Sequence, residues 1–196
     1  MKFSISRDAL IKPLNLVAGV VERRQTLPIL SNVLLVLEGT TLSLTGTDLE
    51  VELIGRVDLE AAGVDGEVTV PARKLVDICK SLAEGSIIEF SMDSGKATVK
   101  AGRSRFTLST LPAADFPAVE GGAGSVSLAL DQSLVKQLID GTAFAMAQQD
   151  VRYYLNGLYL EILGGRLRVV ATDGHRLALA TGPQRVNAED TGVIIP

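Results

Sequence analysis

The chain has 196 residues and a formal net charge of −4. Hydrophobic residues make up 46% of it and aromatic residues 4%, an ordinary composition for one large or two small globular domains. No run of 18 apolar residues occurs, which argues against a membrane span, and no apolar stretch follows Lys2, which argues against a signal peptide. The single cysteine, Cys79, excludes an intrachain disulfide and a cysteine-rich metal site. These features predict a cytoplasmic protein without a membrane span, and the negative net charge argues mildly against a general nucleic-acid coat, although positive charge can still gather on one face.

The residues up to about 111 predict the order strand, helix and three strands, twice in succession. In each round the helix is marked by apolar residues three or four positions apart, and the strands by short apolar runs between turn residues. The elements expected in the first round are 3–6, 8–21, 32–37, 41–45 and 50–58. Those expected in the second round are 67–70, 72–82, 86–91, 97–100 and 103–109.

A third round begins after a segment rich in glycine and proline, residues 115–124, which reads as a linker between domains. We expect a strand at 126–130, a helix capped by Asp131, and two or three strands between 151 and 180. The first of these strands is indicated by residues at or near alternating positions, Leu155, Leu158, Leu160 and Ile162. A further strand at 192–195 opens the next round. The sequence therefore predicts two domains, 1–120 and 121–196, the second cut off partway through.

The rounds are related by a long internal repeat. Leu10 matches Leu134 and Ser31 faces Leu155 at an offset of 124, while Thr47 matches Thr172 and Val70 matches Ile195 at an offset of 125. So long a period indicates a duplicated domain and not a solenoid. In the first copy Pro71 leads into a helix, and the second copy stops at the matching proline, so we expect a piece of a longer protein. The alternative is that this length is natural and the last match is chance.

These segments together resemble the bacterial DNA polymerase III beta subunit, the sliding-clamp family. The resemblance covers the whole chain and is carried by LPILSN from Leu27, LSLTGTDLE from Leu42, VPARK from Val70, GRSRF from Gly102, LSTLPAADFP from Leu108, QDVRYYLNG from Gln149 and TDGHRL from Thr172. It implies an α+β DNA clamp fold, with helices lining one face and sheets on the outside. It also implies a non-enzymatic processivity factor without a cofactor, which has three domains per subunit and closes head-to-tail as a homodimer around duplex DNA.

A sliding clamp must hold phosphates weakly and without reading bases, which favours basic residues on one face. The helical segments 7–24, 72–84 and 131–149 carry net charges of +2, +1 and −1, so the signal is weak, and a solvated helix face explains it as well. The resemblance implies DNA-facing roles for Arg24, Arg73, Gln149, Tyr153 and Tyr154. In an extended strand only one of the two adjacent tyrosines can be core, and the other is free to stack on a base.

The only histidine lies in the polar segment 172–176, and two interpretations compete for it. In the first, Asp173 orients His175 as an acid–base pair, but no nucleophile motif, second histidine or metal-ligand cluster supports an enzyme. In the second, His175 is a hydrogen-bonded structural residue, which is the more common role of a lone histidine in such a turn. Thr47-Asp48 repeats as Thr172-Asp173, which indicates a structural turn in both domains.

The resemblance implies instead a peptide pocket for short linear motifs of the DNA polymerase III alpha subunit, the clamp loader delta subunit and other polymerases or repair proteins. The pocket residues that it implies are Leu155, Thr172, Gly174, His175, Arg176 and Leu177. Because family members complete this pocket with their third domain, we expect weak or no peptide binding by this chain alone. A peptide-binding module that does not act on DNA remains the alternative.

The resemblance also implies a subunit interface on the first domain. An outer strand and the neighbouring helix would meet the third domain of the other subunit, since a head-to-tail ring needs two different complementary faces. The alternative for Ile78 and Leu82 is that they are plain core residues. The interface residues implied are Lys74, Ile78, Leu82, Arg103, Arg105, Phe106 and Leu108.

Overall fold

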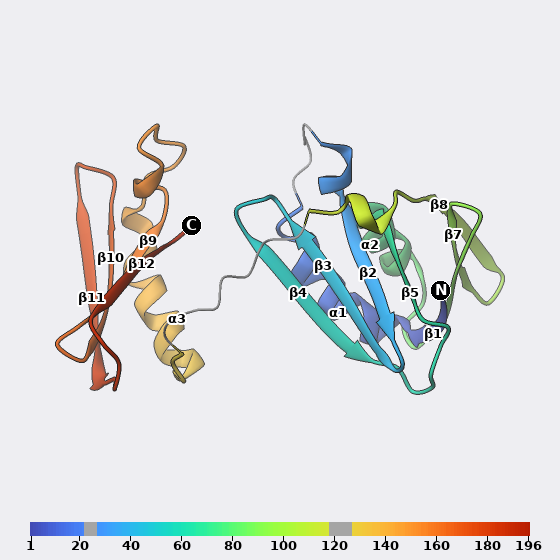
Figure 1. Ribbon diagram of the computed structural model, residues 1–196, viewed down its shortest axis with the longest axis horizontal. Coiled ribbons are helices and arrows are strands. Elements are labelled where there is room, and N and C mark those ends of the chain that lie inside the picture. Colours follow the sequence, from blue (N-terminus) through green and yellow to red (C-terminus); the bar gives the residue numbers. More distant parts are fainter. Residues whose placement is uncertain (22–26, 118–126) are drawn as a thin grey trace. The chain divides into compact units, whose positions relative to one another are not determined.

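The computed structural model describes residues 1–21, 27–117 and 127–196, which fall into two compact units, Met1–Glu120 and Gly121–Pro196 (Figure 1). Both units combine antiparallel sheets with short helices, so the expected α+β class is confirmed. No helix within these three ranges is long and apolar enough to cross a membrane.

The first unit contains strand, helix and three strands, twice, as the sequence predicts. One antiparallel sheet has the order β4-β3-β2-β5 and the other the order β1-β6-β7-β8, so β4 and β8 are edge strands. Two short 3₁₀ turns, η1 and η2, precede β2 and follow β8. The elements are β1 (Lys2–Ser6), α1 (Arg7–Ala18), η1 (Pro28–Ser31), β2 (Asn32–Glu38), β3 (Thr41–Thr47), β4 (Glu52–Asp58), β5 (Gly66–Pro71), α2 (Ala72–Ser81), β6 (Ile87–Asp93), β7 (Lys96–Ala101), β8 (Ser104–Ser109) and η2 (Ala113–Asp115).

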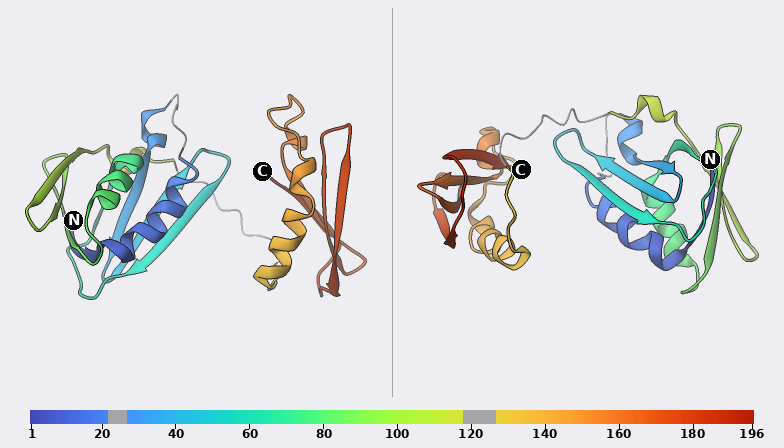
Figure 2. Two further views of the ribbon diagram at one scale, coloured as in Figure 1. Left: turned by 180° about the vertical axis from the view of Figure 1, so that it is seen from behind. Right: turned by 60° about the horizontal axis from the view of Figure 1, so that its bottom comes forward.

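The two helices α1 and α2 pack side by side on one face of the β4-β3-β2-β5 sheet (Figure 2). The Ser6 hydroxyl caps α1 by accepting the N–H of Ala9 at 3.2 Å, and the apolar stripe of the helix is buried. Pro13 lies inside α1, where its ring rests on β4, and a Cβ at Gly55 would come within 2.7 Å of it. A glycine at this strand position is therefore what lets the helix approach the sheet so closely. The buried face of α2, which includes Leu75 and Cys79, completes the same core.

The second unit is built around one sheet of order β11-β10-β9-β12. Its strand pairing copies that of the first unit: Ile162 pairs with Thr191 as Leu37 pairs with Gly66, an offset of 125 at both positions. Helix α3 packs on the sheet and contributes the buried Leu138 to its core. The elements are α3 (Gln132–Asp140), η3 (Ala143–Ala145), η4 (Tyr153–Leu155), β9 (Leu158–Leu163), β10 (Arg166–Thr172), β11 (Leu177–Arg185) and β12 (Thr191–Ile195).

Three local expectations for the second unit are wrong. Residues 127–130 form no strand, because the strand that pairs with β1 in the first unit, β6, has no counterpart among the described residues of the second. Asp131 stands at the N-cap position of α3, but its side chain makes no capping bond. Leu155 ends the 3₁₀ turn η4 and is not in a strand. The match of Ser31 with Leu155 at an offset of 124 is also wrong by one residue. The strand pairing fixes an offset of 125, and no gap separates the strands from the residues before them, so Leu155 corresponds to Leu30.

Candidate functional site

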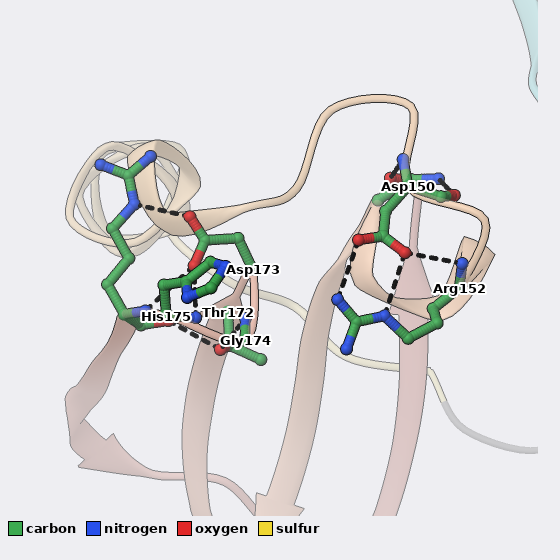
Figure 3. Close-up of polar contacts among 8 residues, drawn as sticks. Asp150, Arg152, Thr172, Asp173, Gly174 and His175 are labelled. Carbon is green, nitrogen blue, oxygen red and sulfur yellow. Dashed lines mark hydrogen bonds and ion pairs between the residues drawn. The ribbon is translucent and has the colours of Figure 1, made fainter.

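The turn between β10 and β11 is organised by the side chains of Thr172 and Asp173 (Figure 3). The N–H of Gly174 donates to Thr172 Oγ1 at 3.1 Å, and the same hydroxyl donates to the carbonyl oxygen of Arg176 at 2.7 Å. Asp173 Oδ1 accepts the backbone N–H groups of His175 and Arg176 at 2.9 and 3.0 Å. Two short polar side chains, Thr172 and Asp173, thus satisfy the backbone of the four-residue connection 173–176, whose remaining side chains are exposed.

The first unit contains the same turn 125 residues earlier. Thr47 Oγ1 accepts the N–H of Leu49 at 3.0 Å, and Asp48 Oδ1 accepts the N–H groups of Glu50 and Val51 at 3.0 and 2.8 Å. The third residue has a positive φ in both units, 82° at Leu49 and 90° at Gly174. The expectation that the shared Thr-Asp is structural is therefore confirmed, and the glycine of the second unit suits a left-handed position of this turn.

The geometry gives no support to an acid–base pair of Asp173 and His175. Both carboxylate oxygens of Asp173 are already bonded, because Oδ2 accepts Nε of Arg176 at 2.9 Å while Oδ1 accepts backbone N–H groups. The backbone N–H groups of His175 and Arg176, followed by the Arg176 side chain, lower the pKa of Asp173 below its usual range. The carboxylate thus holds the turn and does not orient the imidazole.

A second loop, residues 148–156, lies beside this turn. Arg152 donates from Nε and Nη2 to the two carboxylate oxygens of Asp150, at 3.0 and 2.9 Å. These side-chain bonds, with a further bond from the Arg152 backbone N–H, lower the pKa of Asp150 to about 2. The amide of Asn156 closes the loop by accepting the N–H of Asp150 and donating to its carbonyl oxygen, both at 2.9 Å. The loop is consequently held in one shape by its own polar groups.

The two loops meet where Arg152 passes over Gly174. A Cβ built on Gly174 would lie 3.4 Å from Nη2 of Arg152, an ordinary van der Waals contact, so the guanidinium lies close to this turn without excluding a small side chain there. Asp150, Arg152 and Asn156 are not among the site residues predicted from the sequence. An Asp and an Arg two positions apart do not face each other on a helix, and here they pair within a loop, so helical periodicity gives no signal for them.

Tyr153 and Tyr154 both point away from the core. They are 82% and 50% exposed and meet edge to face, with ring centroids 5.9 Å apart. The expected strand is wrong here, because both tyrosines lie in the 3₁₀ turn η4, so the limit of one core position for adjacent strand residues does not apply and neither is core. Gln149, four residues before Tyr153, is also exposed and has a φ of 57°. This segment therefore presents two free aromatic rings, the group that stacks on exposed bases.

Two hollows flank the turn, and each is lined by some of the expected pocket residues. The larger, of about 520 Å³, is polar and includes Met146, Arg152, His175 and Arg176, with Phe144 placed 5.9 Å below the guanidinium carbon of Arg176. The smaller, of about 230 Å³, is mostly apolar. It is lined by Tyr154, Leu155, Gly157, Tyr159, Val170, Thr172 and Ile194.

Of the expected pocket residues, His175 and Arg176 thus line the larger hollow, and Leu155 and Thr172 the smaller. Gly174 and Leu177 line neither, and Leu177 is 66% exposed at the start of the edge strand β11.

In the first unit, Arg73 is the one expected DNA-facing residue that the structure describes, since Arg24 lies outside the described residues. Arg73 is exposed in the first turn of α2, and its Nη2 donates to the carbonyl oxygen of Val21 at 3.2 Å. Lys74 is its exposed neighbour. The start of α2 therefore presents two cations to solvent.

The expected interface residues lie along β8, the turn before it, and α2. Arg103 and Arg105 are exposed, and Phe106 and Leu82 are half-buried against the core. Ile78 and Leu108 are core residues, 8% and 5% exposed. An edge strand with unpaired backbone groups and exposed cations is thus present, while two of the apolar side chains point inward.

Residues 1–120 match the family model of the DNA polymerase III beta subunit, N-terminal domain, and residues 129–196 match that of the central domain. The chain belongs to the DNA polymerase III beta subunit family. Within that family, the beta sliding clamp of Pseudomonas aeruginosa is 65% identical over 197 residues, and that of Escherichia coli 50% identical over 196. Each alignment covers all of this chain and 54% of the relative, so the chain spans about half the length of the beta sliding clamps that it matches.

Solved beta subunits share the fold. The crystal structure of the DNA polymerase III subunit beta from Pseudomonas aeruginosa superposes with a TM-score of 0.96 at 64% identity, covering 100% of this chain and 54% of that one. A sliding clamp from the same organism bound to griselimycin gives a TM-score of 0.94 at 65% identity, with 100% and 53% covered. A beta subunit from Caulobacter crescentus gives 0.92 at 45% identity, with 100% and 54% covered.

Proposed function

We propose that this chain supplies the first domain and part of the second of a DNA sliding clamp. Such a processivity factor encircles duplex DNA without reading its sequence and tethers the replicative polymerase, so it raises the effective concentration of the polymerase at the primer end. The family membership supports this proposal, as do relatives named beta sliding clamp. The proposal includes no catalytic group and no cofactor, and because the partner is chromosomal DNA, it places the protein in the cytoplasm.

One observation carries the proposed site. A single ordered loop, held by the Asp150–Arg152 pair, presents two exposed tyrosines and then Leu155, which lines an apolar hollow beside the Thr172–Leu177 turn. Exposed aromatic rings and an apolar hollow with polar neighbours suit different ligands, an unstacked base and an apolar peptide side chain. The loop thus offers two binding surfaces within a few residues of each other.

The DNA surface in this proposal comprises Arg24, Arg73, Gln149, Tyr153 and Tyr154. Exposed cations and rings without a pocket for base edges suit contact that depends on charge and stacking and not on sequence. The peptide surface comprises Leu155, Thr172, Gly174, His175, Arg176 and Leu177. Its partners would be short linear motifs of the DNA polymerase III alpha subunit, the clamp loader delta subunit and other polymerases or repair proteins.

The proposed ring is a head-to-tail homodimer of the longer protein. The β8 edge with Arg103, Arg105 and Phe106, together with Lys74, Ile78, Leu82 and Leu108, is the proposed contact of the first domain. An unpaired edge strand supports this role, because its free backbone groups can pair with a strand of another subunit.

The DNA surface can be tested in a hybrid clamp, in which this chain replaces the aligned residues of the Pseudomonas aeruginosa relative. Replacing Tyr153 and Tyr154 together by Ala should weaken binding to a primed duplex with a single-stranded overhang, since stacking contributes about 1–3 kcal/mol per base, and should leave blunt duplex binding nearly unchanged. Phe144→Ala, an exposed aromatic of the same unit, is the control. Equal loss in the control and the double variant would contradict the assignment.

The peptide surface can be tested with a fluorescent peptide that binds the Pseudomonas aeruginosa clamp. We expect the 196-residue chain to bind it more weakly than the longer relative does. Equal affinity would show that the pocket is already complete, and His175→Ala without effect in the hybrid clamp would remove the histidine from it.

A further inference from the structure

The smaller hollow of the second unit has a counterpart in the first. Subtracting 125 from its lining residues gives Ile29 for Tyr154, Leu30 for Leu155 and Leu34 for Tyr159. The strand pairing supports this offset, because Tyr159 pairs with Val170 in the second unit as Leu34 pairs with Thr45 in the first. The remaining counterparts are Asn32, Thr45, Thr47 and Thr69.

In the first unit this hollow is filled. Ile29, Leu30 and Phe116 form an apolar cluster of their own, with Leu34 packed against it, separate from the main core of the unit. The exposure of matching residues shows the effect of the filling: Ile29 is 9% exposed where Tyr154 is 50%, and Thr69 is fully buried where Ile194 is 42% exposed. The side chain that fills the space comes from residues 111–116, which follow β8.

This segment is held as a bound peptide would be. Leu111 forms an antiparallel bridge with Thr69 of β5, and the Thr69 hydroxyl donates to the carbonyl oxygen of Leu111 at 2.8 Å and accepts its N–H at 3.3 Å. The buried amide of Asn32 donates to the same hydroxyl at 2.9 Å. After Leu111 the chain turns through η2, which contacts β5 and lies near the end of β2 where η1 leads into that strand (Figures 1 and 2). Phe116 follows η2 and joins the cluster of Ile29 and Leu30. A backbone contact to a strand combined with an apolar anchor is a recurrent mode of peptide recognition.

We propose that the first unit holds a second copy of the apolar peptide hollow, and that residues 111–116 occupy it in cis as an internal ligand. The site takes an external peptide with a leucine and, five residues later, an aromatic anchor once Phe116 no longer fills it. This ligand class rests on the proposed peptide-binding role of the second unit. The internal ligand accounts for a difference between two units that are built on one repeat: the hollow is open in the second unit and filled in the first.

The internal ligand keeps external peptides out by mass action. A segment joined to its site by a short connection acts at an effective concentration of about millimolar, so a peptide at micromolar concentration cannot displace it. Removing the anchor side chain is therefore the way to expose the site while the chain stays otherwise intact.

The test uses the whole chain with labelled isoleucine and leucine methyl groups and a peptide of its own residues 107–117. In the Phe116→Ala variant we expect saturable shifts of the Ile29, Leu30 and Leu34 methyl groups, and at least about tenfold weaker binding by the same peptide with its phenylalanine changed to alanine. The wild-type chain should show no such shifts in the first unit. Phe106→Ala, which removes a half-buried phenylalanine elsewhere in the unit, should also show none.

Absence of these shifts in folded Phe116→Ala would overturn the proposal and leave Phe116 as an ordinary core residue. If that variant does not fold, Phe116→Val should show weaker shifts of the same methyl groups, and their absence there would be equally decisive. Shifts confined to Leu155 and Ile194 would mean that the peptide uses the second unit alone, which refutes the inference but not the proposed function. Loss of DNA binding by the hybrid clamp would refute the proposed function but not this inference, since these methyl shifts require no DNA.

Discussion

Gly174 and Leu49 occupy the same left-handed position in two copies of one turn, so exchanging their residue types should have opposite effects. A residue with a Cβ in the left-handed region costs about 1–2 kcal/mol relative to glycine. At Gly174 the added Cβ of alanine would lie 3.4 Å from the Arg152 guanidinium, an ordinary contact, so the backbone term alone applies. Gly174→Ala should therefore destabilise the β10–β11 connection by about 1–2 kcal/mol.

Leu49→Gly should have the opposite sign. It removes the Cβ that strains the backbone at a φ of 82°, and the leucine side chain is half exposed, so little apolar burial is lost. Glycine gives back about 0.5–1 kcal/mol through its greater freedom in the unfolded chain, so the net gain should be about 1 kcal/mol or less. Leu49→Ala is the matched control, because it removes the side chain but keeps the strained backbone.

Native-state hydrogen exchange measures both effects within their own units, which a single unfolding curve of a two-unit chain does not. Amides of β10 and β11 should exchange about 5–30-fold faster in Gly174→Ala, and amides of β3 and β4 slightly slower in Leu49→Gly. Leu49→Ala should show no such slowing. Unchanged exchange in Gly174→Ala, or faster exchange in Leu49→Gly than in Leu49→Ala, would refute the argument that backbone strain dominates this turn.

Three further predictions follow from polar and buried groups. Arg152 lowers the pKa of Asp150 to about 2, so the ionised carboxylate stabilises its loop fully above the ordinary carboxyl pKa of about 4. This contribution should be lost as the pH falls from about 4 towards 2. An NMR titration of Asp150 should show a midpoint at about 2, and Arg152→Ala should raise that midpoint. Burial raises the pKa of Cys79 to about 11, so a thiol reagent at pH 8 should label it only as fast as the unit opens, and rapid labelling of the native chain would contradict this. Thr69→Val leaves the amide of Asn32 without its acceptor and should lower the stability of the first unit by about 1–3 kcal/mol, measured by native-state hydrogen exchange of the β2 and β5 amides, whereas a change below a few tenths would show that the bond is dispensable.

The sequence predicted the elements of the first unit to within a few residues, because its helices and strands have clear apolar periodicities and both sheets are complete. It failed at residues 127–130, where an alternating segment has no strand to pair with. It also placed Leu155 in a strand with Leu158, Leu160 and Ile162, which lie at or near alternating positions, but Leu155 is three residues before Leu158 and belongs to η4. Local pattern thus predicted local structure wherever the tertiary partner was present.

The candidate site was only partly predictable. The Thr-Asp turn was recognisable because it occurs twice, at 47–48 and 172–173, and repetition separates a structural role from a functional one. The Asp150–Arg152 pair and the division of the pocket into two hollows depend on how loops fold back on each other, which no periodicity encodes. Phe116 was seen only as part of a linker, because its cluster joins residues more than 80 positions apart.

The proposed clamp role is tested most directly by the topology of the DNA that retains the protein. The hybrid clamp, loaded onto a nicked circular plasmid by the clamp loader of the Pseudomonas aeruginosa relative, is moved to high salt, where contacts that depend on charge alone are lost. We predict that the hybrid stays on the circle and leaves within the dead time of the measurement once a single cut makes the DNA linear. A folded hybrid that leaves the intact circle at the same rate as the cut one would contradict the account.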